Sequence, residues 1–406
     1  MADNSLDKIN AQRRLLIKGS LASLAAVGVS STLISRPAYG GDAKLSKIAI
    51  KGTTQNAKGM AFSDYSGKLK PFDFSRRGLG PFDVAIEIKY CGVCHSDVHS
   101  GLGHWGKDLP LPLIPGHEIA GTVTGIGSGV TRFSVGDNVG VGCMVDSCGH
   151  CYECLSGHEQ YCLNRATNTY GEHTSETLNP GGYTQGGYSN RIVVQEHFVI
   201  KVPDSMDLSV AGPIMCAAVT VYSPLLYWRI RSGYKVGIVG LGGLGHMAVQ
   251  IAKAMGAEVV VFTTSPDKVA DAKRFGASDV ILNYDVSHIN KYRGYFDFIL
   301  STVPYRSPLE PLFPTLKHRA TLCLVGLPKS IEPNSIGPFA VAVGRNSFSG
   351  SLIGSIRETQ DIIDFCAENN INPQVELISP YGISESWLNV VNKKSRYRYV
   401  IDMSLI

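Results

Sequence analysis

Short apolar runs broken by Gly and Pro dominate the first half of the chain. Residues 84–88 and 119–123 are two such runs, and a Gly-Asp-Asn turn signal stands at 136–138. Apolar runs of this length between turn-forming residues are typical of β-strands. The pattern predicts a mostly β region over about 44–202, in which the chain returns to strand structure over 188–202.

The period changes near Ser209, where apolar runs begin to alternate with helical patterns. The pattern predicts helices over 246–255 and 266–275. The strands that it predicts around them are 236–239, 258–262, 280–283, 296–301 and 321–326. Strands that alternate with helices imply an α/β fold with a parallel, doubly wound sheet and right-handed crossovers.

After Ser349 the chain is expected to return to the first region. Residues 356–368 have the pattern of an amphipathic helix, and the last forty residues are too few for a separate domain. The sequence therefore predicts two domains, one formed by residues 41–208 with 351–406 and the other by 209–350.

Residues 1–40 differ from the rest and resemble a targeting segment. Arg13 and Arg14 precede an uncharged run of 16 residues at 19–34, and small residues at 38–40 suit a signal peptidase. The run is shorter than the roughly 20 residues of a membrane span. We predict a twin-arginine signal read by that export machinery, and a periplasmic protein. The alternative is an amphipathic or disordered extension, which would leave the protein in the cytoplasm.

Composition describes an ordinary globular protein. Of its 406 residues 44% are hydrophobic and 18% charged, and the net charge is +4. Five Lys/Arg and two Asp/Glu lie within residues 1–40, so most of that charge belongs to the leader. No basic face for nucleic acid is indicated.

Four of the ten cysteines are closely spaced within a predicted lobe at residues 146–165. They are Cys148, Cys151, Cys154 and Cys162. Four thiols at this spacing predict a closed tetrahedral zinc site, with disulfides as the lesser alternative. Cys91, Cys143, Cys323 and Cys366 are expected to take part in neither zinc site.

A second metal site is predicted from Cys94, His117 and Cys216. Two thiolates and one imidazole are the ligand set of a catalytic zinc that keeps one position open for substrate. Alone, each residue has a simpler explanation, because Cys91 and Cys94 could form a redox pair and a single histidine is usually structural.

A glycine-rich motif stands between the strand at 236–239 and the helix at 246–255. Its residues are Gly240, Leu241, Gly242, Gly243, Leu244 and Gly245. In this context the first glycine permits a tight turn, the second lets the backbone approach a pyrophosphate, and the last lets the helix pack on the strand. The motif predicts a dinucleotide at the helix N-terminus, the alternative being a glycine-rich loop without a ligand.

The end of the next strand determines which dinucleotide is expected. An acidic residue there would bind the ribose of NAD, but Glu258 lies at the wrong end of this strand. Thr264, Ser265 and Lys268 instead suit a 2′-phosphate, so NADP(H) is predicted. Lys268 could also be an ordinary solvated helix lysine.

These motifs together resemble the zinc-dependent medium-chain alcohol dehydrogenases. More narrowly, the chain is similar to the cinnamyl alcohol dehydrogenases and their bacterial NADP-dependent aldehyde reductase relatives. The segments that carry the resemblance are 91–97, 115–118, the four-cysteine lobe, 184–188, Cys216 with 221–224, and 350–355. The resemblance implies a GroES-like β domain with an inserted Rossmann domain, two zinc ions per chain, NADP(H) and a homodimer.

The resemblance also assigns roles to further residues. Glu118 is implied as a carboxylate near the catalytic zinc, and Thr220 as a cofactor contact. Asp97 would orient His117, while Ser96 and His99 would form a proton relay, although His99 could be a surface histidine. Leu102 and Trp105 are candidates for an apolar substrate pocket.

The implied activity is hydride transfer between NADP(H) and an aromatic or medium-chain alcohol or aldehyde. Two rivals remain, namely a non-catalytic zinc- or nucleotide-binding envelope protein and an NAD-dependent polyol dehydrogenase. The loop over 168–180 and residues 300–303 depart from the family pattern, and this departure bears on the expected substrate more than on the expected chemistry.

Overall fold

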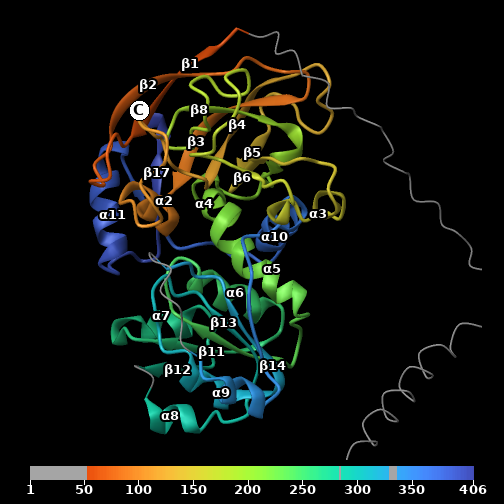
Figure 1. The fold of residues 1–406 in the computed structure, drawn as a ribbon, viewed down its shortest axis with the longest axis vertical. Helices are drawn as coiled ribbons and strands as arrows, with labels where there is room; N and C mark the ends of the chain where they lie inside the picture. Colours follow the sequence, from red (N-terminus) through yellow and green to blue (C-terminus); the bar gives the residue numbers. More distant parts are fainter. Residues whose placement is uncertain (1–52, 283–284, 329–335) are drawn as a thin grey trace, which may run out of the picture. The chain divides into compact units, whose positions relative to one another are not determined.

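A computed structural model of the chain describes residues 53–282, 285–328 and 336–406. The predicted leader at residues 1–40 lies outside these ranges. The described chain contains two large sheets and two small two-stranded ones (Figure 1). This confirms the α/β class.

The first large sheet has seven strands and is mostly antiparallel. Its order is β16-β17-β3-β4-β5-β9, and β8 also pairs with β3. The strands are β3 (Asp83–Gly92), β4 (Ile119–Ile126), β5 (Asn138–Val141), β8 (Arg191–Gln195), β9 (Ile200–Lys201), β16 (Val375–Ile378) and β17 (Arg398–Asp402). The smaller sheets pair β1 (Gln55–Ala61) with β2 (Lys70–Arg76), and β6 (Met144–Asp146) with β7 (Thr167–Asn168). The return to strand predicted over 188–202 takes the form of two strands, β8 and β9, which a 3₁₀ turn at Glu196–Phe198 separates.

The second large sheet has six parallel strands in the order β12-β11-β10-β13-β14-β15. This is the arrangement of a dinucleotide-binding sheet, in which the order of strand addition reverses beside the first strand, here β10. The strands are β10 (Lys235–Val239), β11 (Glu258–Thr263), β12 (Asp279–Leu282), β13 (Phe296–Ser301), β14 (Leu316–Leu324) and β15 (Ser347–Gly350). The helices that accompany them are α6 (Gly245–Ala254), α7 (Val269–Arg274), α8 (Val286–Asn290) and α9 (Pro338–Val343).

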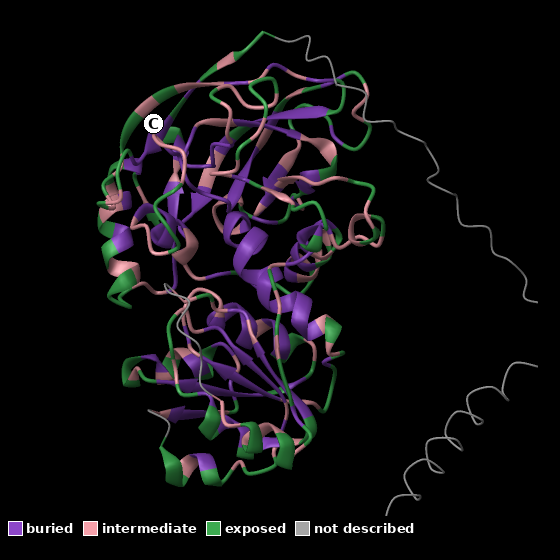
Figure 2. Cartoon of the chain, viewed as in Figure 1, coloured by how far each residue is buried: buried purple, intermediate pink, exposed green. Residues whose placement is uncertain are grey.

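One long helix runs from Leu208 to Tyr227, as α4 (Leu208–Pro213), a π-helical turn (Ile214–Ala218) and α5 (Val219–Tyr227). It is apolar and long enough to cross a membrane, but 78% of its apolar window is buried inside the protein. Figure 2 shows most of its length in purple, the colour of buried residues. The π-helical turn places one extra residue within the helix, a device that is frequent at functional sites.

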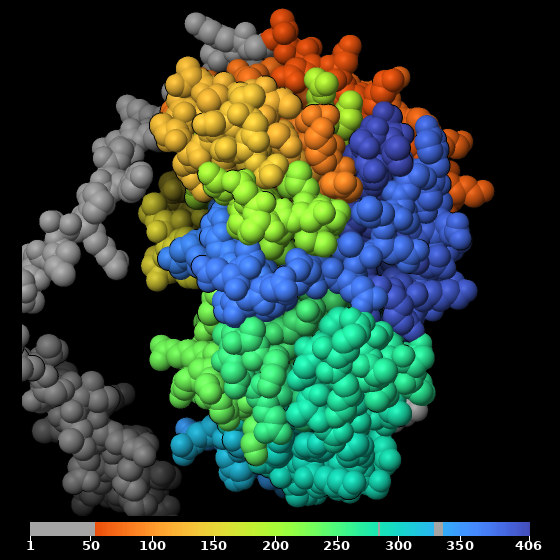
Figure 3. All heavy atoms as spheres, turned by 180° about the vertical axis from the view of Figure 1, so that it is seen from behind, coloured from red at the N-terminus to blue at the C-terminus, as the bar shows by residue number. Residues whose placement is uncertain are grey.

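The C-terminal segment returns to the first sheet, as expected. The helix α10 (Ile356–Glu368) starts with a capping box, in which Ser355 Oγ accepts from the Glu358 backbone and the Glu358 carboxylate accepts from the Ser355 backbone. Its buried residues Ile356, Ile363 and Cys366 form one apolar face. After α11 (Ile383–Val391), β17 pairs antiparallel with β3. From behind, this blue segment covers the middle of the surface between the orange and teal residues (Figure 3).

Candidate active site

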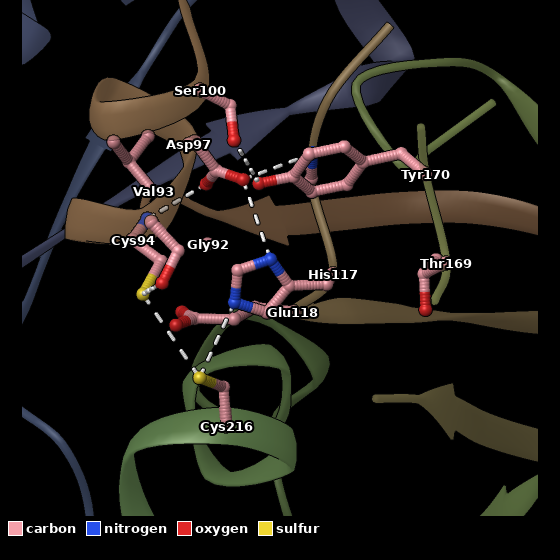
Figure 4. Close-up of polar contacts among 12 residues, drawn as sticks. Gly92, Val93, Cys94, Asp97, Ser100, His117, Glu118, Thr169, Tyr170 and Cys216 are labelled. Atoms are coloured by element: carbon pink, nitrogen blue, oxygen red, sulfur yellow. Dashed lines mark hydrogen bonds and ion pairs between the residues drawn. The ribbon is translucent and has the colours of Figure 1, made fainter. Parts of the chain in front are cut away.

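The metal cluster predicted from the sequence assembles in the structure. Cys94 precedes α2 (His95–Gly101), His117 and Glu118 precede β4, and Cys216 lies in the π-helical turn. All four are buried, and their ligand atoms lie within 4.8 Å of one another. In Figure 4 their side chains converge on a common point.

The distances within this cluster suit zinc. The Cys94 and Cys216 sulfurs are 4.0 Å apart, and His117 Nε2 lies 3.3 Å from the Cys216 sulfur. Bonds of about 2.0–2.3 Å to a tetrahedral zinc bring neighbouring ligand atoms to nearly this separation. The pKa of the Cys94 thiol is well below its usual value, because Cys216 hydrogen-bonds to it and Arg398 and His117 lie near.

Asp97 holds the parts of this cluster in place. Its buried carboxylate accepts hydrogen bonds from the backbone N–H groups of Cys94 at 2.9 Å and Gly116 at 3.2 Å, and from the Tyr188 hydroxyl at 2.9 Å. His117 Nδ1 lies 3.3 Å from the same group, which leaves Nε2 directed at the cysteines. A carboxylate behind a histidine ligand sets its orientation and its tautomer.

Within the described chain Glu118 forms an ion pair with Arg398, a residue that no sequence motif had marked. Arg398 Nη2 lies 3.0 Å from Glu118 Oε1, and both side chains are buried. The contact between the two groups is an ion pair and not a hydrogen bond. Neither Glu118 oxygen has a hydrogen-bond partner in the described structure. Burial raises the pKa of Glu118 to about 8 although Arg398 opposes that shift. An unsatisfied buried carboxylate beside two thiols fits the approach of a metal ion.

The predicted proton-relay residues lie on the same helix. Ser96 Oγ is 3.6 Å from the Cys94 sulfur. His99 is only 3% exposed, so the alternative of a surface histidine was wrong. Its Nδ1 lies 2.8 Å from His104 Nδ1, and burial with the neighbouring His95 and His104 lowers its pKa to about 4. His99 Nε2 has no aligned hydrogen-bond partner among the described residues. His99 is therefore a neutral imidazole at physiological pH.

A cleft of about 810 Å³ connects this cluster to the glycine-rich loop. Leu102, Trp105 and Thr220 all line it. Cys143, which was expected to take part in neither zinc site, also lines it and lies beside Cys216. Tyr170 lies in the loop over 168–180 that departs from the family pattern, and its ring stacks on that of His117 with the ring centroids 5.8 Å apart. No local motif marks Cys143 or Tyr170, because only folding brings them to the metal cluster.

The glycine-rich loop has the geometry that each predicted role requires. Gly240 has φ +93°, and a Cβ at Gly242 would meet nothing within 4 Å, which leaves room for a ligand against the backbone. A Cβ at Gly245 would lie 2.0 Å from the Gly240 carbonyl, so helix and strand can pack only around glycine. The guanidinium of Arg398 lies beside Gly243, and its Nε has no hydrogen-bond partner within the described chain. The site thus offers both backbone and positive charge to a pyrophosphate.

The residues predicted to select the cofactor line the other end of the cleft. Thr264, Ser265 and Lys268 all lie there, after β11. Lys268 is 6% exposed and its Nζ donates to the Leu241 carbonyl at 2.9 Å, so the alternative of a solvated lysine was wrong. Glu258, at the start of β11, bonds to the Tyr295 hydroxyl instead.

The four-cysteine lobe is also assembled. The sulfurs of Cys148, Cys151, Cys154 and Cys162 lie within 4.8 Å of one another. The backbone N–H groups of Cys151 and Leu163 each lie 3.4 Å from a cysteine sulfur, an arrangement that stabilises thiolates. All ten cysteines of the chain are free, so the disulfide alternative was wrong.

Comparison with known proteins agrees with this geometry. Residues 80–204 match the family described as alcohol dehydrogenase GroES-like domain, and residues 243–368 match the zinc-binding dehydrogenase family. An NADP-dependent alcohol dehydrogenase C of Mycobacterium bovis is 45% identical over 332 residues, covering 82% of this chain and 94% of the relative.

Two solved structures share the fold and much of the sequence. A cinnamyl alcohol dehydrogenase of Sorghum bicolor is 38% identical with a TM-score of 0.82, covering 86% of this chain and 98% of the relative. The CAD of Helicobacter pylori, solved with NADP(H), is 40% identical with a TM-score of 0.80, covering 87% of this chain and 99% of the relative. The chain therefore belongs to the zinc-dependent medium-chain alcohol dehydrogenases, in the cinnamyl alcohol dehydrogenase-like group.

Proposed function

We propose that the protein interconverts primary alcohols and aldehydes by hydride transfer with NADP(H). The proposal rests on a single cleft that is lined both by Cys94, His117 and Cys216 and by the glycine-rich loop. Zinc would supply Lewis acidity at the substrate oxygen, and NADP(H) would supply the hydride.

The chain's own residues would bind and orient these groups. Cys94, His117 and Cys216 would hold the catalytic zinc, with Glu118 able to approach it, and the four lobe cysteines would hold a structural zinc. Ser96, beside the Cys94 sulfur, would hydrogen-bond the reacting oxygen. His99 is neutral at physiological pH, so its ring has a lone pair that can accept a proton, while its lowered pKa of about 4 favours passing that proton on. Leu102, Trp105 and Tyr170 would supply an apolar wall that suits aromatic or medium-chain substrates.

Metal analysis combined with an assay of aldehyde-dependent NADPH oxidation tests this proposal. We expect two zinc ions per chain with turnover, and one zinc with no turnover in Cys94→Ala. Cys366→Ala, which alters a buried thiol away from the cleft, should keep both. Zinc without turnover on a broad aldehyde panel would favour a non-catalytic envelope protein. A preference for NAD and polyols would favour the polyol dehydrogenase, although no acidic side chain lies at the cleft end of β11.

We also propose that residues 41–208 and 351–406 form one domain, that residues 209–350 form the other, and that the protein is a homodimer. Strands of the first large sheet come from residues 41–208 and 351–406, and those of the second from residues 209–350. Strand β15 is the outermost strand of the second sheet, and the nearby Phe339 and Phe348 are 81% and 41% exposed. Pairing of two β15 edges would bury these side chains. Phe348→Lys should then produce a monomer in light scattering.

Finally, we propose that Arg13 and Arg14 direct export of the folded, zinc-loaded protein to the periplasm, with cleavage near Gly40. The twin-arginine route carries folded proteins, so the cysteines could bind zinc before they reach an oxidising compartment. Fractionation of cells that carry the wild type or Arg13→Lys/Arg14→Lys tests the proposal. A wild type that stays uncleaved in the cytoplasm would show that the leader is only an extension.

A further inference from the structure

Three cationic residues lie around the end of the cleft that contains Thr264 and Ser265. Lys268 follows β11, whereas Lys393 and Arg396 belong to the C-terminal segment between α11 and β17. Lys268 and Lys393 both line the cleft. Burial lowers the pKa of Lys268 to about 8, and the charges of Arg396 and Lys393 add to that effect. Positive charge from two distant segments is therefore concentrated at this end.

The nearby carboxylates are already engaged by other groups. Asp267 forms an ion pair with Arg396. Asp271 accepts from the Tyr397 hydroxyl at 2.6 Å and from Arg274 at 2.8 Å. Lys393 forms no ion pair within the described ranges, and these two carboxylates do not neutralise it.

Lys393 is oriented toward the cleft by its surroundings. Its Nζ lies 4.3 Å from the centroid of the Tyr305 ring, which belongs to the loop after β13 and also lines the cleft. Its backbone has φ +59°, and its N–H bonds to the Val390 carbonyl, closing the turn after α11. The next residue, Lys394, does not line the cleft. The turn therefore places Lys393 at the cleft and the adjacent Lys394 away from it.

We infer that Lys393 is a second cationic ligand for the 2′-phosphate of NADP(H), opposite Lys268. The inference rests on the proposed use of NADP(H). A phosphate ester with two negative charges is better matched by two ammonium groups than by one. Lys268 ends the 3₁₀ turn (Pro266–Lys268) that follows β11 of the parallel sheet, and Lys393 lies in the segment that leads into β17 of the other large sheet. The 2′-phosphate would thus contact both parts of the chain.

Calorimetric titration of the zinc-loaded protein with NADP⁺ and NAD⁺ tests this inference without turnover. Asparagine is the suitable replacement because it tolerates a positive φ. Lys393→Asn should weaken NADP⁺ binding roughly tenfold, the scale of one charge-assisted hydrogen bond, and leave NAD⁺ binding within about twofold. Lys394→Asn, the matched control, should change neither, and Lys393→Arg should retain most of the NADP⁺ affinity.

The outcomes separate this inference from the proposed function. If the wild type prefers NADP⁺ but Lys393→Asn behaves as Lys394→Asn does, the role of Lys393 is refuted and the cofactor choice stands. Equal losses for both dinucleotides would also refute it, because the residue would then act on the fold. A wild type with no preference for NADP⁺ would overturn both the cofactor choice and this inference.

Discussion

Arg398 Nη2 lies 3.0 Å from Glu118 Oε1, and this buried ion pair joins the last strand of the chain to the metal cluster. Arg398 Nη1 also donates to the Val93 carbonyl at 3.1 Å, next to Cys94. The C-terminal strand therefore takes part in shaping a site whose ligands lie far away in the sequence.

Removing one member of this pair should destabilise the protein. Because the pKa of Glu118 is about 8, the effect should appear above that pH: at about pH 9, Arg398→Met would leave the ionised carboxylate buried without this counter-charge, at a cost of about 2–4 kcal/mol in the free energy of unfolding. Urea unfolding of the zinc-loaded protein measures it. Adding Glu118→Gln to that variant should recover part of the loss. Equal midpoints for the single and double variants would argue against a charge effect.

Replacing Ser96 with alanine should slow turnover without disturbing the metal cluster. Ser96 Oγ lies at the cluster, and loss of a proton-handling group costs about 10²–10⁴-fold in kcat. Steady-state kinetics and zinc content are the measurements. Ser100→Ala, which removes a hydroxyl one turn further along the helix, is the control. A kcat unchanged within threefold in Ser96→Ala would exclude Ser96 from the chemistry.

Lys268 should make cofactor selection depend on pH. Its pKa in the protein is about 8, below the ordinary 10.5, so the free protein loses this charge as the pH rises above 8. A 2′-phosphate favours the charged form, so NADP⁺ affinity should fall by up to about tenfold per pH unit above pH 8, while NAD⁺ affinity stays flatter.

The variant Lys268→Met tests the origin of that slope. It should weaken NADP⁺ binding by about 1–3 kcal/mol and abolish the difference in pH dependence between the two dinucleotides. Because Lys268 also bonds to the Leu241 carbonyl of the glycine-rich loop, we expect a smaller loss for NAD⁺ as well. Identical losses for both dinucleotides would assign Lys268 to the loop alone.

Loss of one lobe cysteine should release a single zinc and loosen only that lobe. Cys154→Ser leaves three thiols for a site that needs four, so zinc content should fall from two ions to one per chain. Limited proteolysis should then cut the variant within residues 146–165, a region that we expect to resist cleavage in the zinc-loaded wild type. Retention of two zinc ions would show that the lobe does not bind metal through Cys154. Cys323→Ser, at a buried thiol in β14, is the control.

The sequence alone determined the features that depend on short spacing. The lobe cysteines fall within fifteen residues, and the glycine-rich motif lies in one turn between a strand and a helix. Steric limits of that turn act on neighbouring residues, so the pattern predicted the positive φ of Gly240 and the close packing at Gly245. The α10 helix was predicted at its observed boundaries because its cap and apolar face are local.

Only the tertiary structure decided which distant residues complete the site. Arg398, Tyr170, Cys143 and Lys393 belong to no local motif, and each reaches the cleft through the pairing or packing of elements far apart in the chain. Burial was equally invisible in the sequence. It made His99 neutral and placed Lys268 against the glycine-rich loop, because the cost of charge depends on the surrounding dielectric. Local spacing specifies motifs, whereas the three-dimensional packing of distant segments sets the electrostatics that act on them.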